Sequence, residues 1–424
     1  MRVIFRGGRI IDPTLGIDLI GDLYIEEGRI KGIAPRIELS EKVEIIEVRD
    51  HFLFPGLVDI HTHLREPGEE WKEDIESGTR EALYGGVLRI ASMANTKPPN
   101  DSPEVTTYIL ERAKEKGWVK VYPVAAITKR LEGKELTEFG RLKEAGAIAL
   151  SDDGKWVQNA ALMKSALLYA KSFDLPIISH CEDATISSGG QINEGKMSAK
   201  LGLKGIPNIS ETIAVVRDLL LAKETQTSVH LAHLSVKENL PFLRWAKEEG
   251  IPFTAETCPH YFTFTEEEVD NYNTLAKVNP PLRTAKDVEA IKEALKEGLI
   301  EVIASDHAPH SPLEKNVEFE LASFGMIGLQ FLLPLSFNLV REKLLTPLKL
   351  LSYLITNPCK VLKVEPPSFK EGNHAEVVIF SPEEEWIPTE ETIQSKSKNT
   401  PLLGKKLKGR VKRVLLGTKL YNFT

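Results

Sequence analysis

The sequence has few cysteines, no long hydrophobic run and no excess of positive charge. Its three cysteines, Cys181, Cys258 and Cys359, are far apart and odd in number, which argues against a disulfide framework. This cysteine usage favours a reducing compartment, so we expect a cytoplasmic protein. No stretch approaches the roughly 18 apolar residues of a membrane-spanning helix, and polar residues interrupt the N-terminal segment too early for a signal peptide. The sequence therefore predicts no contact with membranes.

The charge balance excludes a second class of partner. The formal net charge is −7 and basic residues are interspersed with acidic ones, so no basic field is available to hold a nucleic acid backbone. Hydrophobic residues make up 42% of the chain and charged residues 27%, as is typical of packed globular proteins. The 424 residues are enough for a β/α barrel of about 250 residues and a second compact unit. We therefore expect a two-domain globular enzyme.

Both ends of the chain have the pattern of short β-strands. The first fifty residues alternate apolar and polar positions with Gly between the runs, in RVIFRGGRII, DLYIEEGRIKGIA and KVEIIEVRDHFLF. The same pattern returns in HAEVVIF at 374–380 and in GRVKRVLLGTKLYN at 409–422. We predict that residues 1–53 and 364–424 pair into one small β domain, and that residues 54–363 form the catalytic domain.

The middle of the chain alternates short apolar runs with amphipathic stretches, which is the pattern of βαβ units and a parallel sheet. Eight runs end in polar residues: LVDIHTH, VLRIASMAN, VKVYPVAAIT, AIALSDD, LPIISHCED, TSVHLAHLS, PFTAETCPH and IEVIASDHAPH. Each run is almost continuously apolar before its polar end, as expected for a strand that is buried on both faces. Eight strands can close a barrel, so we predict an α/β fold with an eight-stranded β/α barrel of the TIM type.

Local signals support this alternation. Ser210 and Thr284 could be the N-caps of two barrel helices. Two connections are long, 182–208 after the fifth strand and 307–325 after the eighth, and both are expected on the catalytic face, where such segments serve as lids or binding loops. Four helices are expected to end at a glycine in the left-handed conformation, namely Gly117, Gly146, Gly250 and Gly298.

The strand ends carry a set of metal-ligand residue types. His61 and His63 stand two residues apart at the end of the first run, so both imidazoles face one side of the strand and can share one ion. A single buried histidine is often only a core residue, but further candidates end the fourth, fifth, sixth and eighth runs: Asp152 and Asp153, His180, His233 and Asp306. Nitrogen and carboxylate ligands without thiolates favour a catalytic Zn²⁺, with Mn²⁺ or Co²⁺ as replacements.

These motifs resemble those of the amidohydrolase superfamily and, within it, the class I dihydroorotases. The resemblance rests on FPGLVDIHTHLREPG, MANTKP, SDDG, HCED, HLAHLS, ETCPHY, KVNPPLR and SDHAPH, which follow one another in the family's order across residues 54–310. It also extends to the composite β domain. The resemblance implies a metal-dependent hydrolase that opens and closes the ring amide of dihydroorotate, forming N-carbamoyl-L-aspartate, in pyrimidine biosynthesis.

The same resemblance implies one or two zinc ions. His61, His63 and Asp306 would surround the first ion, and His180 and His233 the second. A carboxylate of SDDG would bridge them, where many relatives have a carboxylated lysine, and we assign this role to Asp153. Asp152 should point the other way and support the site. Cys181 follows His180 and could compete for zinc, although we expect an ordinary buried cysteine.

The resemblance also implies roles for residues around the metal. Asp306 would act as general base and acid, the alternative being a purely metal-binding carboxylate. Arg65, Asn95 and His310 would hold the substrate carboxylate, for which the planar fork of an arginine is suited. The substrate-binding residues that we predict are His63, Arg65, Asn95, Asn279, His310, Phe324 and Gly325, with Asn279 and the backbone of Phe324 and Gly325 on the pyrimidine ring.

Two alternatives remain open. A hydantoinase, dihydropyrimidinase or allantoinase would use the same barrel on another cyclic amide, but SDDG and the arginine of HLRE speak against this activity. A non-catalytic homologue could serve as an assembly partner, although such a chain should have lost metal ligands. We expect a homo-oligomer, and the resemblance adds aspartate transcarbamoylase as a further partner.

Overall fold

The computed structural model describes residues 1–40 and 42–423. Eight parallel strands form a barrel wall in the order β6, β7, β8, β9, β10, β13, β14 and β15. A parallel bridge between Thr62 and His307 joins its two ends. The eight strands lie in the eight predicted runs, which confirms the fold class: β6 (Leu57–Thr62), β7 (Val87–Ser92), β8 (Lys120–Ala125), β9 (Ala149–Leu150), β10 (Ile177–His180), β13 (Val229–Ala232), β14 (Phe253–Thr257) and β15 (Val302–Ile303).

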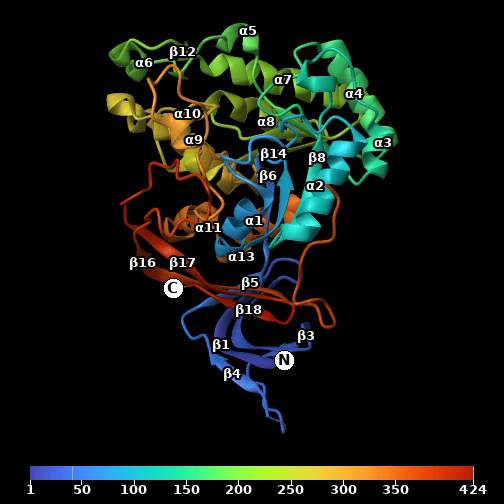
Figure 1. Cartoon of the computed structure of the whole chain (residues 1–424), viewed down its shortest axis with the longest axis vertical. Helices are drawn as coiled ribbons and strands as arrows, with labels where there is room; N and C mark the ends of the chain where they lie inside the picture. Colours follow the sequence, from blue (N-terminus) through green and yellow to red (C-terminus); the bar gives the residue numbers. More distant parts are fainter. Residues whose placement is uncertain (41, 424) are drawn as a thin grey trace.

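Helices follow the strands and surround the barrel, as the upper part of Figure 1 shows. The outer helices after the first seven strands are α1 (Ile75–Tyr84), α2 (Pro103–Lys116), α3 (Phe139–Glu144), α4 (Ala160–Ser172), α7 (Asn208–Thr225), α8 (Leu240–Glu248) and α9 (Ala285–Glu297). After β15 come α11 (Leu332–Ser336), α12 (Asn338–Arg341), α13 (Pro347–Leu351), the π-helix η6 (Ser352–Thr356) and α14 (Asn357–Leu362). Short 3-10 turns complete the barrel: η1 (Lys129–Leu131), η2 (Lys237–Asn239), η3 (Pro259–Phe262), η4 (Glu266–Tyr272) and η5 (Thr274–Ala276).

The helix ends follow the local signals with two exceptions. Thr284 caps α9 as predicted, because its hydroxyl accepts from the backbone N–H of Asp287. Ser210 is not a cap: α7 begins at Asn208 after Pro207, and the Ser210 hydroxyl donates back to the Pro207 carbonyl. Gly117 is extended, with φ −69°, whereas the other three predicted glycines have positive φ. Pro207 has the extended backbone of an N-cap, with φ −72° and ψ 147°, and the helix begins directly after it, two residues ahead of the serine.

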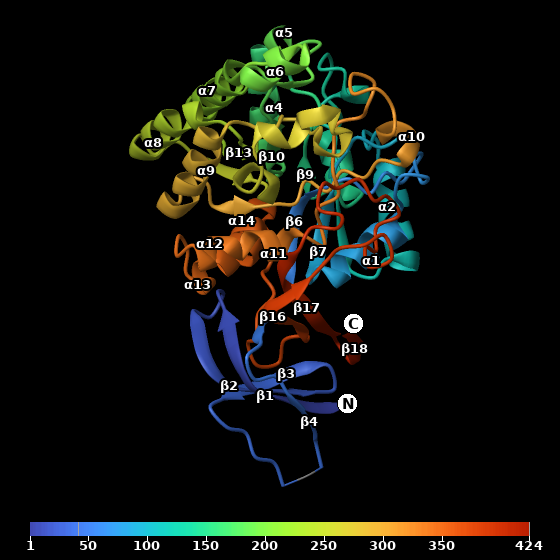
Figure 2. The ribbon, with the colours of Figure 1, turned by 90° about the vertical axis from the view of Figure 1, so that its left-hand side faces the viewer.

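The two long connections are structured. Residues 182–208 contain α5 (Ala184–Ser187), β11 (Ile192–Asn193), α6 (Lys196–Leu201) and β12 (Gly205–Ile206), and β11 pairs with β12 in parallel. Residues 307–325 contain α10 (Pro312–Lys315). In Figure 2, α5, α6 and α10 lie at the end of the barrel that is remote from the chain termini.

The two ends of the chain build one separate sheet, as predicted. Its order is β18, β17, β16, β5, β1, β2 and β3, and β4 pairs with β1. Figures 1 and 2 show the N-terminal and C-terminal strands side by side below the barrel. The domain boundaries given above stay a prediction. The strands are β1 (Arg2–Asp12), β2 (Ile17–Glu26), β3 (Arg29–Ala34), β4 (Glu44–Glu47), β5 (Phe52–Pro55), β16 (Glu376–Trp386), β17 (Leu407–Leu416) and β18 (Lys419–Asn422).

This sheet shares a hydrophobic core with the barrel. Phe380 of β16 packs with Phe337 at 5.2 Å between ring centroids, within the same buried cluster as the barrel helices. A half-buried ion pair between Arg89 of β7 and Glu376 of β16 also crosses the junction, with 2.9 Å between Nη2 and Oε1. The sheet therefore braces the barrel at the end away from the predicted site.

A cluster of small and branched side chains fills the barrel. Its members come from seven of the barrel strands and from α14, and they include Ala91, Val124, Ala149, Ile178, Ala232 and Ala304. The strands carry the predicted metal ligands after these residues, so the packed interior lies beneath the site, as in other β/α barrels. Among the described residues, no helix is long and apolar enough to span a membrane.

Candidate active site

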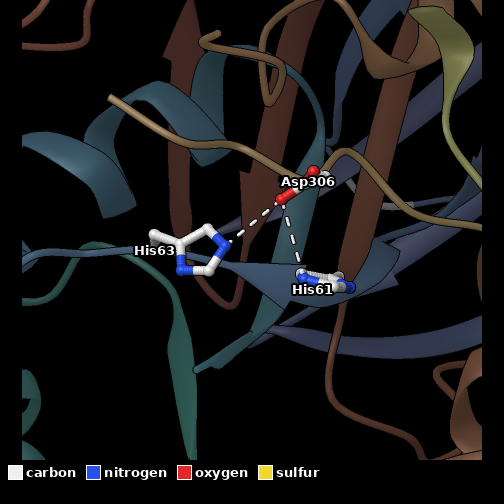
Figure 3. A group of neighbouring side chains, drawn as sticks. All are labelled: His61, His63 and Asp306. Carbon is white, nitrogen blue, oxygen red and sulfur yellow. Dashed lines mark hydrogen bonds and ion pairs between the residues drawn. The ribbon is translucent and has the colours of Figure 1, made fainter. Parts of the chain in front are cut away.

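The six predicted metal ligands meet at the carboxyl ends of their strands. The Asp306 carboxylate lies 3.2 Å from Nε2 of His63 and 3.6 Å from Nε2 of His61 (Figure 3). Figure 3 shows both imidazoles directed toward the same carboxylate. On the other side, Nε2 of His233 lies 2.7 Å from Nδ1 of His180. The common direction of parallel strands brings these residues together from positions up to 245 apart in the chain.

Asp153 stands between the two groups of histidines. Its Oδ1 is 3.1 Å from Nε2 of His61, 3.5 Å from Nδ1 of His180 and 3.7 Å from Nε2 of His233. Asp152 points away, as predicted, and accepts hydrogen bonds from the backbone N–H and the hydroxyl of Thr128. Asp153 therefore has the position that a bridging carboxylate would need.

The donor set fits a metal ion. His61 Nε2 and Asp153 Oδ1 are buried and lack a hydrogen-bond partner, although only 3.1 Å separates them. Buried polar atoms without partners are costly, and a cation bound between them would offset this cost. Potential ligand atoms form two triads at this site. One comprises His61, His63 and Asp306, the other His61, Asp153 and His233, and within each triad the ligand atoms lie within 4.8 Å of one another.

Three of the histidines are oriented by acceptors on their outer nitrogens. Glu256 of β14 lies 2.6 Å from Nδ1 of His61, and Glu182 lies 3.0 Å from Nε2 of His180. The amide oxygen of Asn95 lies 2.8 Å from Nδ1 of His63. An acceptor on one ring nitrogen places the proton there and leaves the other nitrogen free to bind a metal.

Charges in the site stabilise its carboxylates. Although burial opposes ionisation, His61 and His230 lower the pKa of Glu256 well below its usual range. In the same way, His61 and His63 overcome the effect of burial and lower the pKa of Asp306. Both side chains are therefore carboxylates at neutral pH, the form that binds metal and accepts protons.

The backbone is strained where the site residues lie. Arg65, His233 and Asp306 have φ angles of 60°, 37° and 46°, in the left-handed region that residues other than glycine seldom adopt. Such residues typically cost about 1 to 3 kcal/mol each and persist only where the surrounding structure holds them. Backbone strain at three residues of one cavity agrees with a functional role for this rim.

The predicted substrate residues surround one cavity of about 220 Å³. The lining includes Arg65, Asn95, Asn279, His310, Phe324 and Gly325, together with His63, Asp153, His180, His233 and Asp306. A wider groove of about 660 Å³ shares Gly154, Asn279 and Phe324 with this cavity and therefore adjoins it. All predicted site residues except the buried His61 thus line one cavity.

Arg65 supplies the positive charge of this cavity. Its Nε donates to the Pro309 carbonyl at 3.1 Å, and its Nη2 lies 3.2 Å from Nε2 of His310. The same His310 nitrogen lies 2.8 Å from the Phe324 carbonyl, to which it donates when it carries the proton. Burial, followed by the charge of Arg65, lowers the pKa of His310 and keeps its ring neutral.

Four further residues support the site and were not predicted. Glu256 and Glu182 orient metal-ligand histidines, and Glu182 also accepts from the Asn279 amide at 2.8 Å. Glu256 lies next to the last residue of β14, where successive side chains point to opposite faces of the strand. This alternation could have identified Glu256 as an inward-facing residue. The other two residues, Lys315 and Asn399, contact the backbone of the segment 307–325, and no local pattern marks them.

Cys181 is a buried cysteine whose thiol is hydrogen-bonded to the backbone. Its Sγ donates to the Ser179 carbonyl at 3.4 Å, directed away from His180. Burial raises the pKa of this thiol well above its ordinary value. Within the described part of the chain, Cys181 belongs to no cluster of potential metal ligands. The expectation of an ordinary buried cysteine is confirmed.

Known proteins resemble this chain over nearly its whole length. A family model described as dihydro-orotase-like matches residues 50–239. A curated dihydroorotase from Syntrophus aciditrophicus is 48% identical over 412 residues, which are 97% of this chain and 97% of that protein. A dihydroorotase from Caldicellulosiruptor saccharolyticus is 49% identical over 420 residues, which are 99% of this chain and 98% of that protein.

Solved structures agree on the architecture. An L-hydantoinase (dihydropyrimidinase) from Arthrobacter aurescens superposes with a TM-score of 0.88 at 21% identity, over 100% of this chain and 97% of that one. A dihydropyrimidinase from Brevibacillus agri NCHU1002 gives 0.85 at 19% identity, over 99% and 95% of the two chains. At these identities the structures establish only the fold, whereas the curated relatives are close enough to establish the family. This chain belongs to the dihydroorotase family.

Proposed function

We propose that this protein catalyses the reversible hydrolysis of the ring amide of dihydroorotate to N-carbamoyl-L-aspartate, a step of de novo pyrimidine biosynthesis. One observation carries the proposal: a single cavity of about 220 Å³ is lined both by histidine and aspartate side chains of a metal centre and by the cation Arg65. Relatives named dihydroorotase, 45 to 49% identical over nearly the full length, support it.

A metal centre would make the ring amide reactive. In the proposal His61, His63 and Asp306 hold one zinc ion, and His180 and His233 hold a second, with Asp153 between them. Bound zinc supplies a Lewis acid for the amide carbonyl and lowers the pKa of a water molecule. The all-nitrogen-and-oxygen donor set supports zinc, which such catalytic sites commonly bind.

Asp306 is the proposed general base and acid. Its carboxylate lines the cavity and is held in the ionised form by His61 and His63, so it can accept a proton. It would remove a proton from the attacking water and return it to the ring nitrogen as the amide bond breaks. In ring closure the same carboxylate would take the proton from the carbamoyl nitrogen.

The substrate is selected by its carboxylate. Arg65, Asn95 and His310 would hold this group, while Asn279 and the backbone of Phe324 and Gly325 would contact the ring. Gly325 has φ 139°, and a Cβ there would stand 2.8 Å from the Ala308 carbonyl, so only glycine fits this close approach. The close packing brings the 324–325 backbone to the cavity wall.

The test is turnover on matched ring amides, with metal content measured on the same preparation. We expect turnover of dihydroorotate and little or none of dihydrouracil, hydantoin or allantoin, which lack its carboxylate. Faster hydrolysis of hydantoin or allantoin would contradict the proposal. A metal-loaded protein that turns over none of the four would support the non-catalytic alternative.

We further propose that the chain works in an assembly, as a homo-oligomer or with aspartate transcarbamoylase. Leu313 and Leu321 support this because they are 82% and 73% exposed on the segment 307–325, beside the cavity, and exposed apolar side chains of this size suit contact with another chain. Light scattering and turnover should be measured for the chain alone and mixed with aspartate transcarbamoylase. A monomer whose mass and activity do not change in the mixture would contradict this.

A further inference from the structure

A second set of potential metal donors adjoins the catalytic ligands. Cys258 directly follows β14, His260 lies in η3, and Asp306 follows the neighbouring strand β15. One donor atom from each of the three lies within 4.8 Å of the other two. The set differs from the catalytic one because it includes a sulfur atom.

The histidine of this set has an Nε2 atom that no other group in the described structure engages. Nε2 of His260 is buried and has no hydrogen-bond partner, and the residue is only 4% exposed. An unpartnered buried nitrogen is costly, and a bound cation would offset that cost.

We propose that Cys258, His260 and Asp306 form a subsite for a thiophilic divalent ion, such as Cd²⁺ or excess Zn²⁺, which inhibits the enzyme by withdrawing Asp306 from the reaction. As the sulfur–metal bond forms, the thiol of Cys258 loses its proton to solvent. The resulting thiolate and the Asp306 carboxylate balance the two charges of the ion, so no oxidant is needed. The inhibition rests on the proposed role of Asp306.

One member of the subsite faces the catalytic cavity. Asp306 lines that cavity, whereas Cys258 and His260 are not among its lining residues and are 0% and 4% exposed. We expect the ion to enter from the cavity, so a ligand that fills the cavity should slow its binding.

The other two cysteines provide matched controls. All three are free and buried. The Cys181 thiol donates to a backbone carbonyl, and neither Cys181 nor Cys359 joins a cluster of metal-ligand residues in the described ranges. Replacement of either cysteine thus changes the thiol count equally but leaves the proposed subsite intact.

The experiment is a Cd²⁺ titration of the enzyme that already holds its catalytic metal. Binding is followed by the ultraviolet charge-transfer absorption of a thiolate–cadmium bond and by the cadmium content. We expect the band, one additional ion per chain and a parallel loss of turnover in the parent, Cys181→Ser and Cys359→Ser. Cys258→Ser should lack the band and need at least about tenfold more Cd²⁺ for inhibition, the scale on which even hydrogen-bond partners of ligands change metal affinity.

Two results would overturn the subsite: a band that persists in Cys258→Ser, or a parent that binds no additional ion. His260→Gln, expected to weaken the band, provides a second variant, and a thermal melt of each variant checks its folding. The band and the ion count do not depend on turnover. A parent that shows the band but does not hydrolyse dihydroorotate would therefore contradict the proposed function and leave the subsite standing.

Discussion

The catalytic cavity has two halves that are built differently. The metal half consists of side chains at strand ends, and the outer nitrogens of three of its four histidines face carboxylate or amide oxygens such as those of Glu256 and Asn95. The substrate half lies on connecting segments, where Arg65 is held by the Pro309 carbonyl and His310 by the Phe324 carbonyl. The geometry of the metal half therefore depends on the barrel strands. The geometry of the substrate half depends on the hydrogen bonds that hold its connecting segments in place.

Two side chains tie the loop of the substrate half. The buried ammonium of Lys315 donates to the carbonyls of Lys277, Ser323 and Gly325 at 3.3, 2.7 and 3.0 Å. Asn399, from the connection between β16 and β17, donates to the Gly325 carbonyl at 3.1 Å and accepts from the backbone N–H of His310 at 3.0 Å. The two halves should therefore fail separately: damage to the first should release metal, and damage to the second should weaken substrate binding.

The largest expected effect is in the metal half. His61→Ala or His63→Ala should empty the first metal position and abolish measurable turnover, because each removes a nitrogen ligand from the triad with Asp306. Metal analysis and a dihydroorotate assay measure this. Circular dichroism and thermal melting serve as controls, because the packed core lies below the site. Full zinc occupancy in either variant would refute the ligand assignment.

Asp306→Asn should come next. An amide of the same size can remain in the site, but it cannot take the proton from water, so turnover should fall by orders of magnitude while substrate still binds. Single-turnover kinetics and substrate binding are measured on metal-loaded protein. Nearly normal turnover would contradict the role as general base. A modest loss of metal would not, since the same carboxylate is also a proposed ligand.

Arg65→Ala tests the substrate half directly. A charge-assisted contact contributes about 1.5 to 3 kcal/mol, so kcat/KM for dihydroorotate should fall by a factor of roughly ten to about 150. Hydrolysis of ring amides without the carboxylate should change little, and metal content should not change. The measured quantity is the ratio of kcat/KM for dihydroorotate and dihydrouracil in parent and variant. An unchanged ratio would favour a hydantoinase activity.

A pair of supporting residues sharpens the comparison. Glu256→Gln should lower metal affinity about 10- to 100-fold, the usual effect of losing a partner of a metal-bound histidine. Asn399→Ala should leave the metal in place and raise KM by roughly tenfold, as expected for one or two lost hydrogen bonds at about 1 kcal/mol each. Metal dissociation constants and steady-state kinetics distinguish them. If Asn399→Ala released metal, the two halves would not be independent.

The last prediction concerns stability and pH and leaves the catalytic reaction aside. Burial lowers the pKa of Lys315 from 10.5 to about 7, so between these pH values the unfolded chain binds a proton that the folded chain lacks. The free energy of unfolding should therefore rise with pH in this window, by at most a few kcal/mol, on the order of 1.36 kcal/mol for each pKa unit.

Lys315→Met should reduce this rise, which urea unfolding at pH 7 and pH 10 would measure. Lys116→Met, at an exposed position at the end of α2, is the control and should retain the pH dependence of the parent. Equal slopes for parent and Lys315→Met would show that the buried ammonium does not titrate in this range.

The sequence by itself determined the barrel and most of the metal half. The apolar runs specified the strands, and parallel strands bring their carboxyl ends to one rim, so His61, His180 and Asp306 had to meet there. The terminal strands could be predicted in the same way from their alternating apolar and polar residues. The residues of the substrate half were predicted from a family resemblance, since their spacing alone does not define a cavity.

Only the tertiary structure decided which distant side chains support the site. Glu256 and His61 are 195 residues apart in the sequence and come together because β14 and β6 belong to the same barrel. Asn399 lies in the C-terminal part of the chain and contacts the segment 307–325. It also decided between cysteines: Cys181, adjacent to a ligand in sequence, turns away, whereas Cys258 lies beside Asp306. Local patterns encode which face a residue takes along its own strand, but contacts across the barrel depend on how separate strands and loops pack.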